Sequence, residues 1–357
     1  MKLNSLMHKE AMETIREKLE KIEEQVLSKY ACLSKKSLGR DVPEEECALR
    51  TVFQRDRDRI IHCKSFRRLK HKTQVFLIPE GDHYRTRLTH TLEVSQIART
   101  IAKSLMLNED LTEAIALGHD LGHTPFGHAG EAVLNKLLPQ GFEHCVQSVR
   151  LVEKIERNGE GLNLTKEVRD GILNHRTSGN PKTLEGKIVR ISDKIAYINH
   201  DIDDAITARI LNEKDLPKDV TDIIGNSVKS RIDFLIKDIV YNSYDKNDII
   251  MSDEVSKAIS KLRSWLFENV YNNNNKKNLA KSEEKKAQKV VEILFDYFKN
   301  NISEMPEEYI NLINKGEDEL QVVSDYISGM TDDFAISKFK ELYVPVGWKV
   351  KWNSKRL

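Results

Sequence analysis

Apolar and polar residues follow one another along most of the chain with the spacing of amphipathic helices. Between Glu10 and Tyr30, apolar side chains recur among Glu and Lys at Ile15, Leu19, Ile22 and Val26. Such spacing places them on one face of a helix. Helical patterns also cover residues 50–73 and return from 88 to about 211, interrupted by turns that contain Gly or Pro. We therefore expect an all-α fold.

One short segment breaks this pattern. Between Gln74 and Arg87, an apolar run at 75–78 is followed by the turn residues Pro-Glu-Gly-Asp at 79–82 and then by Tyr84 and Thr86. Short extended arms on both sides of such a turn predict a small β-hairpin. No other segment predicts β structure convincingly.

The distribution of residue types divides the chain into three parts. We predict an N-terminal helix and loop over residues 1–49, a central core over 50–215 and a C-terminal helical region over 216–357. The C-terminal region is rich in Lys and Asn, and its run 272–278 is typical of an exposed linker between two helices. The last histidine is His200, so we expect the chemistry to lie in the first two thirds.

The overall charge is nearly balanced, with 57 Lys and Arg against 56 Asp and Glu. A net charge of +1 does not indicate a nucleic-acid-binding or membrane-surface protein, although local patches can still be basic. The cysteines are far apart and form no CxxC pair, as in cytosolic proteins with reduced thiols: Cys32, Cys47, Cys63 and Cys145. No apolar run approaches the roughly 20 residues that span a bilayer. We expect a soluble cytoplasmic protein with no membrane partner.

The residues best suited to chemistry are concentrated between positions 118 and 131. The adjacent pair His119 and Asp120 offers an imidazole nitrogen and a carboxylate oxygen from one point on the backbone. Alone it binds a divalent metal poorly, because a stable site needs about four protein ligands. His90 and Asp193 each stand among apolar residues in a helical pattern. Burial of those helices would turn both polar groups towards an interior site.

The order His, His-Asp, Asp resembles the signature of the HD-domain superfamily. Longer segments extend this likeness to the deoxyguanosine-triphosphate triphosphohydrolase-like family: 53–94, 118–131, 142–144, 171–175, 191–204 and 325–332. The resemblance covers most of residues 50–210 and reappears near 325–340. It implies a helical HD fold with a small β-hairpin and a C-terminal helical extension, which completes the nucleotide pocket or a subunit interface.

The resemblance implies that His90, His119, Asp120 and Asp193 are metal ligands. A single His or Asp is usually a helix cap or a satisfied polar group, so it is the set of four that indicates a metal site. Two nitrogen and two oxygen ligands leave positions for water and a phosphate oxygen. Mixed ligation of this kind suits Mn²⁺, Fe, Co or Ni and tolerates Mg²⁺ or Zn²⁺.

A second group of residues can transfer protons. His128 and Glu131 are three residues apart, so on a helix they share a face and the carboxylate can orient the imidazole. His123, four residues after the first histidine of the block, should also face the site. The resemblance places His123 and His128 near the phosphates and makes His128 and Glu131 a catalytic couple.

The resemblance also gives His144 a part in the chemistry, although Cys145 stands where the family pattern has Asn. We assign His128 and Glu131 to proton transfer at the attacking water and His144 to the leaving group. The two roles could be exchanged.

A triphosphate requires fixed cations around it. Arg87, one helical turn before the first ligand, and Lys194, next to the last, should both project near the metal, and the resemblance supports both as phosphate contacts. The basic stretch 55–72 is mostly a solvated surface by its composition. A minority of its side chains, such as Arg68 and Lys70, could contact a nucleotide effector or single-stranded DNA.

Sugar recognition is expected from a stripe on one helix. Asp193, Tyr197 and Asp201 recur at intervals of four residues, so they lie on one face. The resemblance places Gln74, Tyr197 and Asp201 around a deoxyribose, with Gln74 and Asp201 at the 3′-hydroxyl. Tyr197 packed on the 2′-carbon would exclude a ribose hydroxyl, although such a tyrosine is as often a plain core residue.

The reaction implied is hydrolysis of a deoxynucleoside triphosphate (dNTP) to deoxynucleoside and inorganic triphosphate, in control of the dNTP pool. The enzymatic alternative is another HD hydrolase, acting on nucleoside monophosphates or a phosphodiester. A non-catalytic nucleotide or single-strand-binding protein is the alternative from a different class. The apolar segment 290–298, read as exposed surface, predicts a homo-oligomer, with packing inside one subunit as the alternative.

Overall fold

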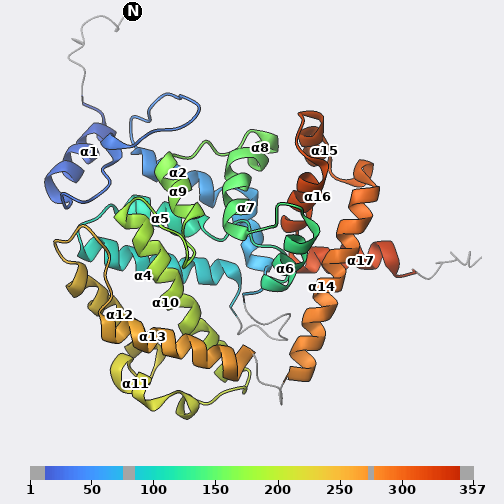
Figure 1. Ribbon diagram of the computed structural model, residues 1–357. Helices are drawn as coiled ribbons and strands as arrows, with labels where there is room; N and C mark the ends of the chain where they lie inside the picture. The colour runs from blue at the N-terminus through green and yellow to red at the C-terminus, as the bar shows by residue number, and fades with distance from the viewer. Residues whose placement is uncertain (1–12, 75–84, 272–276, 346–357) are drawn as a thin grey trace, which may run out of the picture.

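The computed structural model describes residues 13–74, 85–271 and 277–345 (Figure 1). The described residues are helices and loops without a β-strand, apart from an isolated antiparallel bridge between Thr73 and Thr86. The prediction of an all-α fold is therefore confirmed. The predicted hairpin falls mainly on residues 75–84, which lie outside the described residues, and the bridge joins the two chain segments that lead into it. None of the described helices is both long and apolar enough to cross a membrane.

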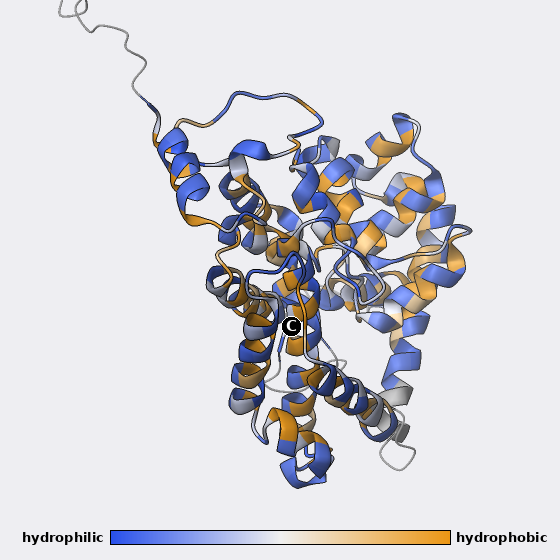
Figure 2. Cartoon of the chain, turned by 60° about the vertical axis from the view of Figure 1, so that its left-hand side comes forward, coloured by the Kyte–Doolittle hydropathy of each residue, from blue (hydrophilic) through white to orange (hydrophobic). Residues whose placement is uncertain are grey.

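The centre of the protein is a group of helices from the middle of the chain. The group consists of α2 (Val52–Ile61), α4 (Arg87–Ser104), α5 (Glu109–Gly118), α9 (Lys166–Leu173) and α10 (Leu184–Thr207). α4, α5 and α10 pack against one another, while α2 and α9 pack against α5. They share one apolar cluster, in which Val94, Ile115 and Ile195 are fully buried. In Figure 2 the hydrophobic colour alternates with the hydrophilic colour along the helices, as expected of amphipathic helices.

Short helices complete the N-terminal and central parts of the chain. They are α1 (Ile15–Val26), η1 (Ser34–Lys36), α3 (Lys64–Arg68), η2 (Leu69–His71), α6 (His128–Leu137), α7 (His144–Arg150), η3 (Leu151–Ile155) and α8 (Glu156–Gly159). The described part of the predicted N-terminal helix is shorter than its pattern, because Thr14 caps α1 at its start and the helix ends before Leu27.

The C-terminal third forms two separate groups of helices. The first is η4 (Glu213–Asp215), α11 (Lys218–Ile224), α12 (Val228–Ser243), α13 (Asp253–Leu266) and η5 (Phe267–Tyr271). The second is α14 (Lys277–Asn300), η6 (Ile302–Glu304), α15 (Glu307–Asn314), α16 (Glu319–Ser328) and α17 (Asp332–Tyr343). α12 packs on α4 and α10, whereas α14 packs on α6, α16 and α17. In Figure 1 the two groups lie on different sides of the central helices.

The apolar clusters do not follow the predicted boundary at residue 215. Leu235, Ile239 and Ile259 of the first group are fully buried in the cluster of the central helices. Val291 and Leu294 of α14 are fully buried in a second cluster with residues of α6 and α16. The segment 290–298 is therefore internal packing, and the exposed apolar surface from which we predicted a homo-oligomer is not there.

Buried polar contacts join the second C-terminal group to the loops of the central helices. Asp332 accepts hydrogen bonds from the backbone N–H groups of Thr73 (3.0 Å) and Phe126 (2.9 Å). Lys72, which is buried, donates to the carbonyl oxygens of His123 and Ser328 (2.8 Å for the second). Burial and the nearby Arg68 lower the pKa of Lys72 to about 7. α16 and α17 thus hold the loop that carries the 118–131 block.

Asp325 is the most deeply buried charge of this interface. It is fully buried and accepts from Gln147 (2.9 Å) and from Arg150 Nε and Nη2 (2.9 and 2.7 Å). We expect Asp325→Ala to lower the free energy of unfolding by about 3–5 kcal/mol, because it leaves a largely buried guanidinium without its main partner. Urea denaturation followed by circular dichroism measures this. The control Asp296→Ala removes an exposed carboxylate and should change stability by less than about 0.5 kcal/mol; equal effects of the two variants would contradict this account of the interface.

Candidate metal and catalytic centre

Three helices bring the four proposed metal ligands together. His90 lies in the first turn of α4, whose start is fixed by Thr86, because the Thr86 side chain accepts from the Thr89 N–H. His119 and Asp120 follow the end of α5, and Asp193 lies in the middle of α10. Because α4, α5 and α10 pack against one another, residues far apart in the sequence meet at this point.

His90, His119 and Asp120 offer ligand atoms close enough to one another to hold a single cation, and Asp193 lies beside the two histidines. His90 Nε2 is 3.1 Å from Asp193 Oδ1, and His119 Nε2 is 3.4 Å from Asp120 Oδ1 and 3.8 Å from Asp193 Oδ1. Donors that lie about 2.0–2.2 Å from a divalent ion are roughly 3–3.5 Å apart. His90, His119 and Asp120 are all buried, and Asp193 is half-buried.

Of the two proposed histidine ligands, His119 has its coordinating nitrogen free of hydrogen bonds within the described part of the chain. His119 Nδ1 is 2.6 Å from the carbonyl oxygen of Ala116, so the N–H is on this nitrogen and Nε2 carries the lone pair. His119 Nε2 is buried and has no hydrogen-bond partner among the described residues. An unpaired buried nitrogen is costly unless something binds it. The residues present therefore fit a divalent metal.

Both carboxylates are held in the charged form that a metal requires. Burial alone would raise the pKa of Asp120, but His119, His123 and Arg87 outweigh burial and hold it well below its usual range. Burial likewise opposes the lowering of the pKa of Asp193, which is produced by His90 and His119. Arg87 Nη1 donates to Asp120 Oδ2 at 2.9 Å. The predicted phosphate contact Arg87 thus lies directly beside the ligands.

A chain of polar side chains runs beside this group. Glu131 Oε1 is 2.9 Å from His144 Nδ1, and His144 Nε2 is 3.2 Å from His175 Nε2. His128 Nδ1 is 3.3 Å from Glu131 Oε2. Burial alone would raise the pKa of Glu131, but hydrogen bonds from His128 and His144 hold it far below its usual range. The His128 side chain is 83% exposed, so it lies at the rim, whereas His144 lies inside.

His123 connects the two groups. Its ring stacks on His144 with centroids 3.9 Å apart, and its Nε2 is 3.1 Å from Asp120 Oδ1. Burial and the nearby Arg87 hold the pKa of His123 well below its usual value, so the ring is neutral.

A close backbone approach makes this stacking possible. A Cβ on Gly122 would lie 2.3 Å from Ser148 N and 2.5 Å from His144 O. Only glycine lets the loop lie against the first turn of α7, which carries His144.

The proposed sugar contacts contain further unpaired polar atoms. Gln74 Oε1, Tyr197 OH and Asp201 Oδ1 are buried without a hydrogen bond among the described residues, although Arg263 lies close to the Tyr197 hydroxyl. The backbone oxygen of Gln74 would lie 3.6 Å from a Cβ on Gly127, which places Gln74 beside the 118–131 block. Tyr197 and Asp201 face the interior from α10.

Several residues near the site were not predicted from the sequence. His175 follows α9 and donates from Nδ1 to the carbonyl oxygen of Ile172 (2.7 Å). It is the last residue of the segment 171–175, which carries part of the family resemblance, so the sequence did contain a signal for it. Arg263 comes from α13, in the motif-poor region. Burial, together with Arg263 and Arg190, lowers the pKa of Lys194, so the predicted phosphate contact Lys194 belongs to a group of cations.

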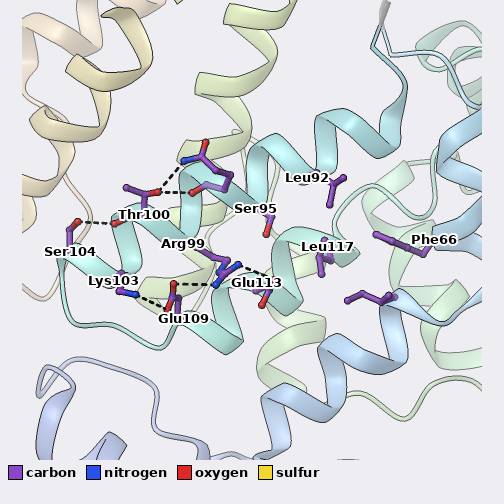
Figure 3. A pocket seen from close by; sticks show the side chains of 12 residues that line it. Phe66, Leu92, Ser95, Arg99, Thr100, Lys103, Ser104, Glu109, Glu113 and Leu117 are labelled. Carbon is purple, nitrogen blue, oxygen red and sulfur yellow. Dashed lines mark hydrogen bonds and ion pairs between the residues drawn. The ribbon is translucent and has the colours of Figure 1, made fainter. Parts of the chain in front are cut away.

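A groove among the described residues lies elsewhere. It has a volume of about 570 Å³ and is lined by residues of α4 and α5, among them Leu92, Gln96 and Arg99 (Figure 3). At 100° per residue, these positions are on the side of α4 opposite His90. The groove is therefore separate from the metal and histidine groups.

The fold and site define a class of protein that comparison with known families supports. Residues 87–198 match the HD domain, and residues 249–341 match the phosphohydrolase-associated domain. A phosphohydrolase from Bacteroides thetaiotaomicron VPI-5482 has a similar fold, with a TM-score of 0.50 at 16% identity over 80% of this chain and 67% of that one. The protein is an HD-domain phosphohydrolase.

Closer relatives specify the family. The deoxyguanosinetriphosphate triphosphohydrolase-like protein of Caldanaerobacter subterraneus subsp. tengcongensis is 60% identical over 334 residues, which cover 94% of this chain and 97% of that protein. The protein of the same name from Clostridium perfringens strain SM101 is 53% identical, with coverage of 93% and 98%. The chain belongs to the deoxyguanosinetriphosphate triphosphohydrolase-like family, as its motifs predicted.

Asp201, a proposed sugar contact, is expected to lower the stability of the folded protein at neutral pH. Burial raises the pKa of Asp201 well above its usual value, and Asp204 and Asp193 add to the effect. As pH rises above about 4, the unfolded carboxyl ionises while the folded one stays protonated, so the folded state loses stability. We expect Asp201→Asn to stabilise the metal-free chain by about 0.5–2 kcal/mol at neutral pH, and by less at pH 4.

Urea denaturation between pH 4 and 8 tests this expectation. The control Asp203→Asn changes an exposed carboxylate on the same helix and should shift stability by less than about 0.5 kcal/mol. A destabilised Asp201→Asn variant at pH 8 would show that the Asp201 carboxyl supports the fold.

Proposed function

We propose that this protein hydrolyses dNTPs to deoxynucleoside and inorganic triphosphate. The observation that carries the proposal is that six of the residues expected at the site have a buried polar atom without a hydrogen-bond partner among the described residues: His119 Nε2, His123 Nδ1, Arg87 Nε, Gln74 Oε1, Tyr197 OH and Asp201 Oδ1. A purely structural core would have these atoms paired. The names of the relatives support a deoxynucleoside triphosphate as the molecule that pairs with them.

His90, His119, Asp120 and Asp193 would hold a divalent cation, which when bound lowers the pKa of a water ligand and polarises a phosphoryl oxygen. Two nitrogen and two oxygen donors suit Mn²⁺, Fe, Co and Ni and tolerate Mg²⁺ or Zn²⁺. The other steps of the reaction rest on the chain's own side chains.

His144 is the best-placed proton donor for the leaving 5′-oxygen. His175 donates from Nδ1 to a carbonyl oxygen, so its Nε2 can only accept, and His144 Nε2 must donate to it. The ionised Glu131 can only accept from His144 Nδ1. This pairing gives His144 a proton on each nitrogen. Of the two role assignments, it favours His144 as the acid at the leaving group and His128 with Glu131 at the attacking water.

The charges and shape of the site support a deoxynucleoside triphosphate as the substrate. Arg87 and Lys194, with Arg263 near Lys194, supply fixed positive charge for a triphosphate. Gln74 and Asp201 offer unpaired oxygens for a 3′-hydroxyl, and Tyr197 offers a ring against the 2′-carbon. A ribonucleotide would place a hydroxyl against this ring, so we propose selectivity for deoxyribose.

The alternatives are less well supported. A single-strand-binding surface needs free cations, but Arg55 and Arg59 pair with Glu44, and Arg57 pairs with Asp110. A phosphate monoester or diester carries less negative charge than a triphosphate, so several cations beyond the metal ligands favour the triphosphate. A homo-oligomer, a nucleotide or DNA effector near Arg68 and Lys70, and a cytoplasmic location remain proposals that rest on the resemblance.

The proposed metal ligands are tested by Asp193→Asn. The variant should lose bound metal and reduce kcat by more than the roughly 10–100-fold that loss of a supporting hydrogen bond costs, because one charged donor is gone. Elemental analysis and the dNTPase assay measure both. Asp203→Asn on the same helix should keep full occupancy. Full metal occupancy in Asp193→Asn would remove this residue from the site.

The bond that is broken is tested by product analysis. Attack at the α-phosphorus releases triphosphate in one piece, so the phosphorus NMR spectrum should show inorganic triphosphate and no pyrophosphate. The assay is run with all four dNTPs and several metals. Release of pyrophosphate together with a nucleoside monophosphate, or of orthophosphate in steps, would rule out the proposed reaction.

A further inference from the structure

The second nitrogen of His90 faces another histidine. His90 Nδ1 is 3.2 Å from His200 Nδ1, and the two rings meet edge to face with centroids 5.3 Å apart. His200 lies on α10, two turns after Asp193, and is buried. It has no part in the proposed chemistry.

His200 is itself held by a carboxylate. Its Nε2 is 2.7 Å from Glu93 Oε2, and Glu93 also accepts from Arg85 Nε at 3.1 Å. Arg85 Nη1 donates in turn to Asp203 (2.7 Å) and Asp204 (2.9 Å). A continuous set of contacts therefore runs from an ion-pair cluster at the surface to the ring of His90.

The donor and acceptor roles along this chain follow from Glu93. A carboxylate only accepts, so the N–H of His200 must be on Nε2. In the neutral ring Nδ1 is then an acceptor, and His90 Nδ1 must donate to it. With Nδ1 engaged in this way, His90 presents Nε2 to the proposed metal position, where Asp193 Oδ1 lies 3.1 Å away. Because a carboxylate only accepts, a bound cation would take the place of a proton on Nε2.

The two proposed histidine ligands obtain the same tautomer in different ways. His119 donates from Nδ1 to the backbone oxygen of Ala116, an acceptor that no substitution removes. His90 depends on a side chain that can be changed. Hydrogen-bond partners of metal-binding histidines fix both the tautomer and the direction of the ring.

We propose that His200, oriented by Glu93, is a positioning residue that sets the tautomer and ring direction of His90 for metal binding. The inference rests on the proposed metal centre. It predicts that a substitution of His200 or Glu93, neither of which is a proposed metal ligand, weakens the affinity for the metal.

The first test is titration of the metal-free full-length chain with Mn²⁺ by calorimetry. His200→Phe keeps a ring but removes both nitrogens, and we expect Kd for Mn²⁺ to rise by about 10–100-fold. His200→Asn can place its amide oxygen where Nδ1 stood, so it should recover most of the affinity. A wild-type Kd in a folded His200→Phe variant would overturn the proposal.

Two further variants, Glu93→Ala and Asp203→Asn, test the same proposal if His200→Phe does not fold. Glu93→Ala removes the acceptor that fixes His200, and should raise Kd by about 3–10-fold, less than direct loss of the ring partner. Asp203→Asn alters the same Arg85 cluster without touching His200, and should leave Kd unchanged. Equal Kd values for these two variants would overturn the role of Glu93 and with it the proposed chain.

The second test does not depend on metal or activity. Long-range proton–nitrogen NMR of histidine-labelled metal-free protein reports which ring nitrogens are protonated, and His90 should carry a proton on Nδ1 in the wild type and lose part of that signal in Glu93→Ala. A wild-type His90 protonated on Nε2 alone would overturn the proposal. If the spectrum agrees but the wild type binds no Mn²⁺, the metal centre is wrong, and so is the positioning role that rests on it.

Discussion

The compensation of buried negative charge is the constraint on which this site depends. A carboxylate leaves water only when cations or hydrogen bonds replace its hydration. Asp120 meets this condition through Arg87 and His123, and Asp193 through His90. Each of these partners comes from a helix end or a helix face that must be correctly placed. The packing of α4, α5 and α10 is thus coupled to the charge balance of their contact point.

The two C-terminal groups of helices act on this centre in different ways. α11–α13 enlarge the apolar core behind α4 and α10, and α13 brings Arg263 towards Tyr197. α14–α17 hold the loop of the 118–131 block from outside, through Asp332 at the Phe126 N–H and through Lys72, which donates to the carbonyl oxygens of both His123 and Ser328. The phosphohydrolase-associated domain therefore positions the loop that carries His123 and His128 in addition to extending the core.

Sequence patterns predicted the parts of this structure that depend on local rules. Helical spacing gave the all-α fold, and the ordered histidine and aspartate motifs identified the family. The packing of segment 290–298 was predicted wrongly because an apolar helix face looks the same whether its partner is the same chain or another subunit. The contacts of His144 with His175 and of His90 with His200 join side chains from different parts of the chain. Residue spacing within one helix does not predict such contacts. For the same reason no pattern indicated that Arg55, Arg57 and Arg59 are neutralised by acids distant in sequence.

The central claim is that His90, His119, Asp120 and Asp193 together bind one divalent cation. Diffraction from crystals of the Mn²⁺-loaded protein, recorded on both sides of the manganese absorption edge, locates the ion directly. The account predicts one strong anomalous peak per chain, within about 2.0–2.3 Å of His90 Nε2, His119 Nε2 and an oxygen of each aspartate. A peak bound by other residues, or none at this position in fully loaded crystals, would contradict it.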